Sequence, residues 1–241
     1  MHQVGMMRDV FEGASSTTVW LGLSTVGECE SAMKFLAHIG SDGDLHLDPL
    51  LVPYVEVEGM NILSSQIIAG LKSLFGSSWW SRVWTVQEWF LSRHAVFQSG
   101  PLLIEGLNVQ RALDHWNSHM YDQACCYGFL VGHPKGRDLF AHFDKLFYLT
   151  QDTVGSSLPY TISLFRDNCV VTDPRDKGYG ILSLARGQYE NAVDADYTQT
   201  IEAAFQATTI QMIRQTGSLE VLSHIPGAVD PELALPSYVT D

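Results

Sequence analysis

The sequence predicts an α/β or α+β protein that is predominantly helical around a small sheet. Apolar residues recur at the three- and four-residue spacing of amphipathic helices, for example over 64–75 and 199–215. Short runs rich in β-branched or other large apolar residues are typical of strands and occur at 17–21, 95–98 and 102–104. Hydrophobic residues make up 46% of the 241 positions, which is ample for a core.

Helices and strands alternate in the first half of the chain. Residues 2–13 have helical spacing, 17–21 predict a strand that Gly22 ends, and 28–39 predict a helix that stops at Gly40. Ser99-Gly100-Pro101 separates two short apolar runs, which predicts a hairpin. Further predicted helices are 64–75, 107–121, 138–151, 159–167, 174–186 and 199–215, with a soft boundary in the loop at 132–136.

The densest aromatic stretch begins at Trp79 and predicts one continuous helix over 80–92, which we name the hub helix. Its apolar face would carry Trp80, Val83, Trp84, Gln87, Phe90 and Leu91. A buried amide without partners costs about 1–3 kcal/mol, so we expect Gln87 to bond to backbone of another segment. Glu88 lies at the margin of this face, and the simplest expectation is a structural ion pair, with Arg175 as the candidate partner.

Four motifs together resemble the fungal heterokaryon-incompatibility (HET) domain. The Arg-x-Trp-Thr-Val-Gln-Glu run at 82–88 is similar to the family's signature, and the helix and strand at 2–22 are similar to its Val-x-Trp-Leu-Gly region. Residues 173–179 resemble its Asp-x-Arg-Asp-Lys-x-Tyr element, and 235–239 its Leu-Pro-Ser-Trp-Val exit. Because the four occur in the family's order, the resemblance implies a single partial HET domain over 1–241, with a helical part at about 107–241.

The chain departs from the family pattern at two places. The family usually opens with two strands that precede the first motif found here, so we expect an N-terminally truncated copy. Gly178 and Gly180 stand where the family usually has apolar residues or alanine. HET domains have been proposed as distant relatives of TIR domains, which implies a TIR-like core whose first strands are missing. An unpaired sheet edge would favour self-association or pairing with another protein.

The resemblance implies a role in fungal non-self recognition, or vegetative incompatibility, in which the domain triggers programmed cell death as a signalling or interaction module. A TIR-like NAD-hydrolysing enzyme is the alternative, with Glu88 as its catalytic candidate and NAD as substrate rather than cofactor. An inactive fragment is the third reading. The motif residues are Trp20, Gly22, Arg82, Trp84, Gln87, Glu88, Asp173, Arg175, Asp176, Lys177, Tyr179 and Tyr197.

Several of these residues have a structural reading beside the functional one. Arg82, Arg175 and Asp176 could hold a phosphate-bearing ligand, although such clusters more often tie helix ends together. Trp20, Trp84 and Tyr197 are expected in the core with their polar atoms bonded. Asp173 before Pro174 is typical of a helix N-cap.

Composition disfavours several classes of function. The net charge of −13 argues against nucleic-acid and anionic membrane surfaces. Four cysteines without C-x-x-C spacing favour a reducing cytoplasm, and the sequence contains neither a run that could span a membrane nor a secretory signal. The motifs of serine hydrolases, HExxH metalloproteases and P-loop proteins are absent, so no cofactor is implied.

Two stretches carry residues that could bind a metal. The acidic loop 41–48 lacks the bidentate glutamate of a calcium loop, which favours a solvated loop. His115 and His119 would point the same way on a helix, but no third ligand has a recognisable spacing. The sequence therefore predicts a wet helix face there and no bound metal.

Overall fold

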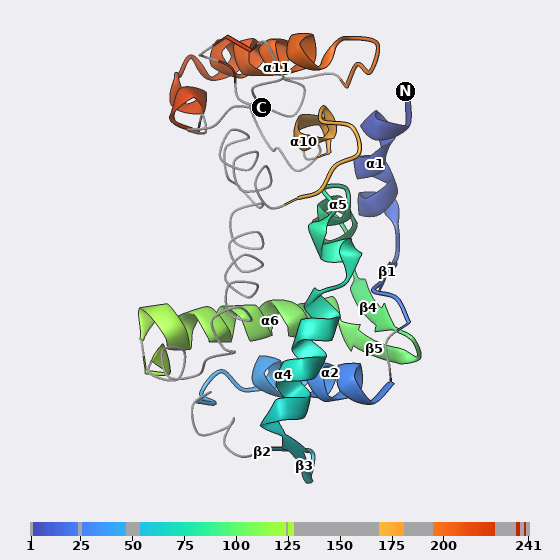
Figure 1. Cartoon of the computed structure of the whole chain (residues 1–241), viewed down its shortest axis with the longest axis vertical. Coiled ribbons are helices and arrows are strands. Elements are labelled where there is room, and N and C mark those ends of the chain that lie inside the picture. Colours follow the sequence, from blue (N-terminus) through green and yellow to red (C-terminus); the bar gives the residue numbers. More distant parts are fainter. Residues whose placement is uncertain are drawn as a thin grey trace. The chain divides into compact units, whose positions relative to one another are not determined.

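A computed structural model describes residues 2–23, 26–46, 54–123, 125–127, 169–180, 195–224, 235–236 and 239 (Figure 1). The predicted helices at 138–151 and 159–167 and the loop at 132–136 lie outside these residues. The chain divides into two compact units: unit 1 comprises Met1–Ser15, Ser81–Arg93 and Gln151–Asp241, and unit 2 comprises Ser16–Trp80 and His94–Thr150. Among the described residues, no helix is both long enough and apolar enough to cross a bilayer.

Unit 2 contains a three-stranded sheet in the order β1-β4-β5. Strand β1 (Thr17–Trp20) runs parallel to β4 (Ala95–Ser99), and β4 pairs antiparallel with β5 (Leu102–Glu105). Gly22 ends β1 at a φ of +104°, which other residues rarely adopt, and its carbonyl accepts a hydrogen bond from Gly100 at 3.0 Å. The predicted strand and hairpin are confirmed.

Three helices of unit 2 pack together, and two of them pack against this sheet. Helix α2 (Val26–Ser41) packs against α4 (Ser64–Phe75) and α6 (Gly106–Asn117), and both α2 and α6 contact the sheet (Figure 1). Gly40 permits the approach of α2 to α6, because a Cβ there would lie 2.5 Å from the Asn108 carbonyl oxygen. A π-helical turn, η2 (Ser118–Asp122), extends α6. The three predicted helices are confirmed within a few residues at their ends.

Unit 2 contains a second hairpin that the sequence patterns did not predict. Strands β2 (Tyr54–Val57) and β3 (Met60–Leu63) pair antiparallel through a turn at Glu58 and Gly59, both with positive φ. Val55 and Val57 are buried while their neighbours are exposed. An alternation over only four residues is too short to predict a strand, and a longer helical pattern follows it directly.

The hub helix is not continuous, so that prediction is wrong. A 3-10 turn, η1 (Ser78–Ser81), is separated from the short helix α5 (Thr85–Phe90) by residues that include Arg82, which forms an isolated parallel bridge with Val170. The Ser81 carbonyl accepts from the Val170 amide, and the Arg82 carbonyl accepts from Thr85 Oγ1 at 2.6 Å. A helix needs such carbonyls for the amides four residues later, so these bonds favour the break.

The residues on the two sides of this break belong to different units. Trp80 stacks on Phe97 in unit 2, with ring centroids 5.2 Å apart and planes 9° from parallel, and its Nε1 donates to the Leu74 carbonyl at 2.8 Å. Val83 is buried among the residues of unit 1. The apolar stripe that predicted one helix is therefore divided between two units.

Unit 1 is helical in its described part. Helix α1 (His2–Gly13) packs against α5, and α10 (Asp176–Tyr179) and α11 (Ile201–Thr216) follow, with a 3-10 turn η5 (Glu220–His224) against α11. Thr200 Oγ1 caps α11 by accepting from the Ala203 amide, and Gly217 ends it at a φ of +61°. The predicted class, helices around small sheets, is confirmed.

Candidate functional site

The motif residues of unit 1 converge on the carboxylate of Asp176, at the start of α10. Trp84 donates its Nε1–H to one carboxylate oxygen at 3.2 Å, and the Tyr197 hydroxyl donates to the other at 2.5 Å. Trp84 and Tyr197 are half-buried rather than in the core, but their polar atoms are bonded as predicted. Asp176 thus joins segments that lie 92 and 21 residues away in the sequence.

Arg175, the residue before Asp176, makes the other hydrogen bonds of this network. Its Nε and Nη2 donate to the two carboxylate oxygens of Asp173 at 2.9 and 2.6 Å, and Nη1 donates to the carbonyls of Tyr197 and Gln199 at 2.9 and 2.6 Å. Hydrogen bonds from Arg175 lower the pKa of Asp173, and the same pair raises the pKa of Arg175. The expected pairing of Arg175 with Glu88 is wrong, because Asp173 offers a bidentate partner only two residues away.

Asp173 also organises the turn before α10. One of its carboxylate oxygens accepts the Arg175 amide at 3.0 Å, which is the bond expected from an N-cap side chain. Within the described residues the helix itself begins at Asp176, two residues later than predicted. The N-cap position is Arg175, which makes no side-chain cap bond, so the prediction of Asp173 as the N-cap is wrong; its carboxylate instead closes a turn before the helix.

Gln87 connects α5 to the end of α10. Its side chain is 1% exposed, and its Nε2 donates to the backbone carbonyl of Gly180, as expected of a buried amide. Its buried Oε1 accepts no hydrogen bond from the part of the chain that the structure describes. A Cβ on Gly180 would lie 2.8 Å from the Asp176 carbonyl oxygen and 2.8 and 2.9 Å from the methyl carbons of Val83, so this corner admits only glycine without a shift.

Two tyrosines complete the network. The rings of Tyr179 and Tyr197 meet edge to face with centroids 5.2 Å apart, and the Tyr179 hydroxyl donates to the Asp196 carbonyl at 3.3 Å. Burial raises the pKa of both phenols, and for Tyr197 the bond to Asp176 acts in the same direction. We name the set Trp84, Gln87, Asp173, Arg175, Asp176, Tyr179, Gly180 and Tyr197 the motif network.

Other predicted site residues lie outside these contacts. Trp20 is 49% exposed on β1, so its placement in the core is wrong: alternation along the strand buries Val19 instead. Glu88 is half-buried on α5, and its backbone carbonyl accepts from the Ser92 hydroxyl. Arg82 is exposed and Lys177 is half-buried.

A second constellation, in unit 2, was missed by the sequence analysis. His119 is 3% exposed, so the predicted wet helix face is wrong there. The side chains of His46, Cys125 and Cys126 surround it. His115 lies apart from them and bonds to the Ile39 carbonyl at 2.6 Å. The features that could have predicted this cluster are a histidine in the acidic loop and two adjacent cysteines, but they belong to no common short sequence motif.

Comparison with known proteins bears on the motif network. The family described as "Heterokaryon incompatibility protein (HET)" matches residues 1–88. "Heterokaryon incompatibility protein 6, OR allele" of Neurospora crassa is 26% identical over 253 aligned positions, which cover 90% of this chain and 37% of that protein. The chain therefore spans little more than a third of the length of this relative. No solved structure matches the chain.

The two matches overlap in the N-terminal part and extend the likeness over most of the chain. The residues matched by the family include Trp84, Gln87 and Glu88 of the signature-like run at 82–88. The resemblance of this chain to the fungal heterokaryon-incompatibility (HET) family is therefore confirmed.

Proposed function

We propose that the chain acts in fungal non-self recognition as a signalling or interaction module whose activation triggers cell death. The observation that carries the choice of a module over an enzyme is the internal bonding of the motif network. Both carboxylate oxygens of Asp176 accept bonds from Trp84 and Tyr197, and the guanidinium of Arg175 is held by Asp173 and two carbonyls. These charged groups serve the fold of unit 1 instead of facing a ligand.

The network would transmit the state of one segment to another. Helix α5, which packs on α1, is joined to α10 through Trp84 and Gln87, and α10 is joined to the start of α11 through Tyr197 and the Gln199 carbonyl. Buried charge-assisted hydrogen bonds are strong and geometrically specific. A partner that displaced one of these segments would therefore disturb the others.

The test is inducible expression of the whole chain in a filamentous fungus, with dye uptake and total NAD followed over time. We expect the wild-type chain to kill, and Tyr197→Phe combined with Trp84→Phe to lose killing because Asp176 loses both donors. Tyr54→Phe is the matched control, because Tyr54 is exposed on β2 and outside unit 1, and it should kill like the wild type.

Two outcomes would contradict the proposal. Normal growth while the folded chain accumulates would show that this chain has no killing activity. A fall in NAD before dye uptake, prevented by Glu88→Gln in a variant that melts like the wild type, would select the NAD-hydrolysing alternative.

The same proposal includes protein partners or self-association in the cytoplasm. Within the described residues, β1 pairs on one side only, with β4, and it carries the exposed Trp20. An outer strand with an exposed aromatic side chain favours association with another chain. Light scattering after size exclusion should show concentration-dependent association that Trp20→Ser weakens, and a monomer at all concentrations would count against it. A fluorescent fusion would test the cytoplasmic location.

A further inference from the structure

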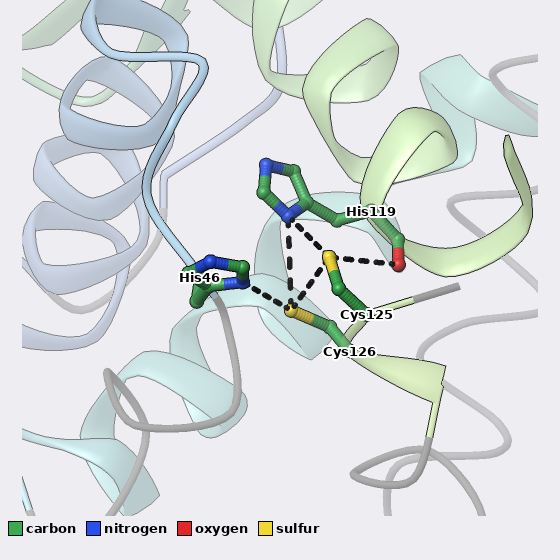
Figure 2. Close-up of side chains that lie close together, drawn as sticks. All are labelled: His46, His119, Cys125 and Cys126. Atoms are coloured by element: carbon green, nitrogen blue, oxygen red, sulfur yellow. Dashed lines mark hydrogen bonds between the residues drawn. The ribbon is translucent and has the colours of Figure 1, made fainter. Parts of the chain in front are cut away.

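Four side chains with metal-binding atoms gather at one end of unit 2 (Figure 2). His46 lies in the loop that follows α2, His119 lies in η2, and Cys125 and Cys126 lie in the turn after it. One nitrogen of each histidine and the two sulfurs all lie within 4.8 Å of one another. Figure 2 shows both sulfurs and both imidazoles turned towards a common centre.

The separations of these atoms resemble the edges of a zinc tetrahedron. Zn–N bonds of about 2.0–2.1 Å and Zn–S bonds of about 2.3 Å at tetrahedral angles give edges of roughly 3.8 Å between sulfurs and 3.6 Å between sulfur and nitrogen. The two sulfurs are 3.9 Å apart, and Cys126 Sγ lies 3.7 Å from His46 Nδ1 and 3.8 Å from His119 Nδ1. A fourth contact, Cys125 Sγ to His119 Nδ1, is shorter at 3.0 Å and would have to open slightly around an ion. The two other edges, from His46 to Cys125 Sγ and to His119, are at most 4.8 Å and would have to close.

The protonation of His119 suits a ligand. Its Nε2 lies 2.7 Å from the Gly43 carbonyl oxygen, so Nε2 carries the hydrogen and the lone pair of Nδ1 faces the sulfurs. Metal-binding histidines usually donate their other N–H to a carbonyl or carboxylate in this manner. The Gly43 carbonyl thus orients the ring, while His46 meets it edge to face at a centroid distance of 5.2 Å.

Two other uses of these residues fit less well. A disulfide between the adjacent cysteines would need sulfurs about 2.05 Å apart, and both are free thiols. A site for catalysis would keep an open coordination position, whereas two cysteines and two histidines fill all four positions of a tetrahedral ion. His119 and Cys126 are almost fully buried, whereas His46 and Cys125 are exposed, so the ion would lie at the edge of the core.

We propose that His46, His119, Cys125 and Cys126 bind one Zn²⁺ as a structural site. The ion would fasten the loop after α2 to the end of α6 and to the turn at 125–127, in addition to the hydrogen bonds between His119 and the Gly43 carbonyl and between the Cys126 amide and the His119 carbonyl. The ligand set of two thiolates and two imidazoles is typical of zinc. The inference is independent of the proposed role in non-self recognition.

The test begins with metal content. The whole chain, purified under reducing conditions without chelator from zinc-supplemented culture, should contain about one zinc per molecule by mass spectrometry. Cys126→Ser and His119→Asn should each weaken zinc retention by roughly tenfold or more in a competition with a chromogenic chelator. Cys29→Ala and His38→Gln are matched controls from α2, outside the cluster, and should retain zinc like the wild type.

Two measurements on the wild-type chain keep the proposal testable even if the variants fail to fold. Replacement of zinc by Co²⁺ should give a thiolate-to-metal charge-transfer band and the intense visible bands of tetrahedral cobalt. Zinc should also protect Cys125 and Cys126, but not Cys169, from alkylation. A chain that lacks zinc after this purification, a cobalt spectrum without a thiolate band, or equal alkylation with and without zinc would overturn the proposal.

Discussion

Gly180→Ala should destabilise unit 1, although alanine is a better helix former than glycine. The new methyl group would lie 2.8 Å from the Asp176 carbonyl oxygen and under 3 Å from both methyl carbons of the buried Val83. Overpacking of this kind costs about 1–3 kcal/mol, and the stiffer unfolded chain returns only about 0.4–1 kcal/mol. We expect a net loss of about 1–2 kcal/mol of unfolding free energy, partly through displacement of the Gly180 carbonyl from Gln87.

Gly178→Ala, inside α10, is the matched control for Gly180, which caps the end of that helix. Among the described residues, no atom lies within 4 Å of a Cβ at this position, so the substitution should stabilise by about 0.5–1 kcal/mol. Thermal melts followed by circular dichroism should therefore shift in opposite directions, by about 2–4 °C per kcal/mol for a chain of this size. Equal shifts of both variants in the same direction would refute the packing argument and leave helix propensity as the explanation.

Three further changes probe contacts in both units. Gly40→Ala would place a Cβ 2.5 Å from the Asn108 carbonyl and should cost about 1–3 kcal/mol in urea unfolding. Tyr197→Phe removes a bond to the charged Asp176 and should cost about 1.5–3 kcal/mol in the same assay. The pKa of Asp173 in the folded chain is below its ordinary value of 3.8. Its stabilising contribution is therefore complete above pH 3.8 and is lost as the pH falls through the lowered pKa. Thermal midpoints of Asp173→Asn should decline less steeply with acid than those of the wild type.

Each of these changes has a control or a contradicting result. Gly13→Ala, at the end of α1, meets no atom within 4 Å among the described residues and should not lower the stability measured by urea unfolding. Tyr54→Phe should likewise be neutral, because its side chain is exposed. Parallel acid profiles for Asp173→Asn and the wild type would show that the arginine pair contributes nothing to acid stability.

Local patterns predicted those elements whose neighbours lie nearby in the sequence. Helix α4 has the predicted limits, and the hairpin of β4 and β5 lies where a Ser-Gly-Pro turn separates two apolar runs. Gln87 found a backbone partner in another segment because a buried amide has few alternatives. In these cases local chemistry and the final environment agree.

Most of the failures have one physical cause, which is a partner far away in the sequence; Arg175, whose partner Asp173 is two residues away, is the exception. The hub helix breaks because Val170 takes the Ser81 carbonyl, and periodicity carries no information on such a bond. Arg175 was assigned to a distant glutamate although Asp173 was close at hand. His46 and His119 are 73 positions apart, so only the packing of α2 on α6 could bring them together with the two cysteines.

The division of the chain into units has a consequence for synthesis and for recombinant work. The chain passes from one unit to the other four times, after residues 15, 80, 93 and 150. Neither unit can be cut out as one contiguous piece: residues 1–88 alone would leave β1 without β4 and Gln87 without Gly180. During synthesis, α1 and α5 are made long before α10, so unit 1 can complete its contacts only after α10 has left the ribosome. This delays the folding of unit 1 and prolongs the time in which chaperones can bind it.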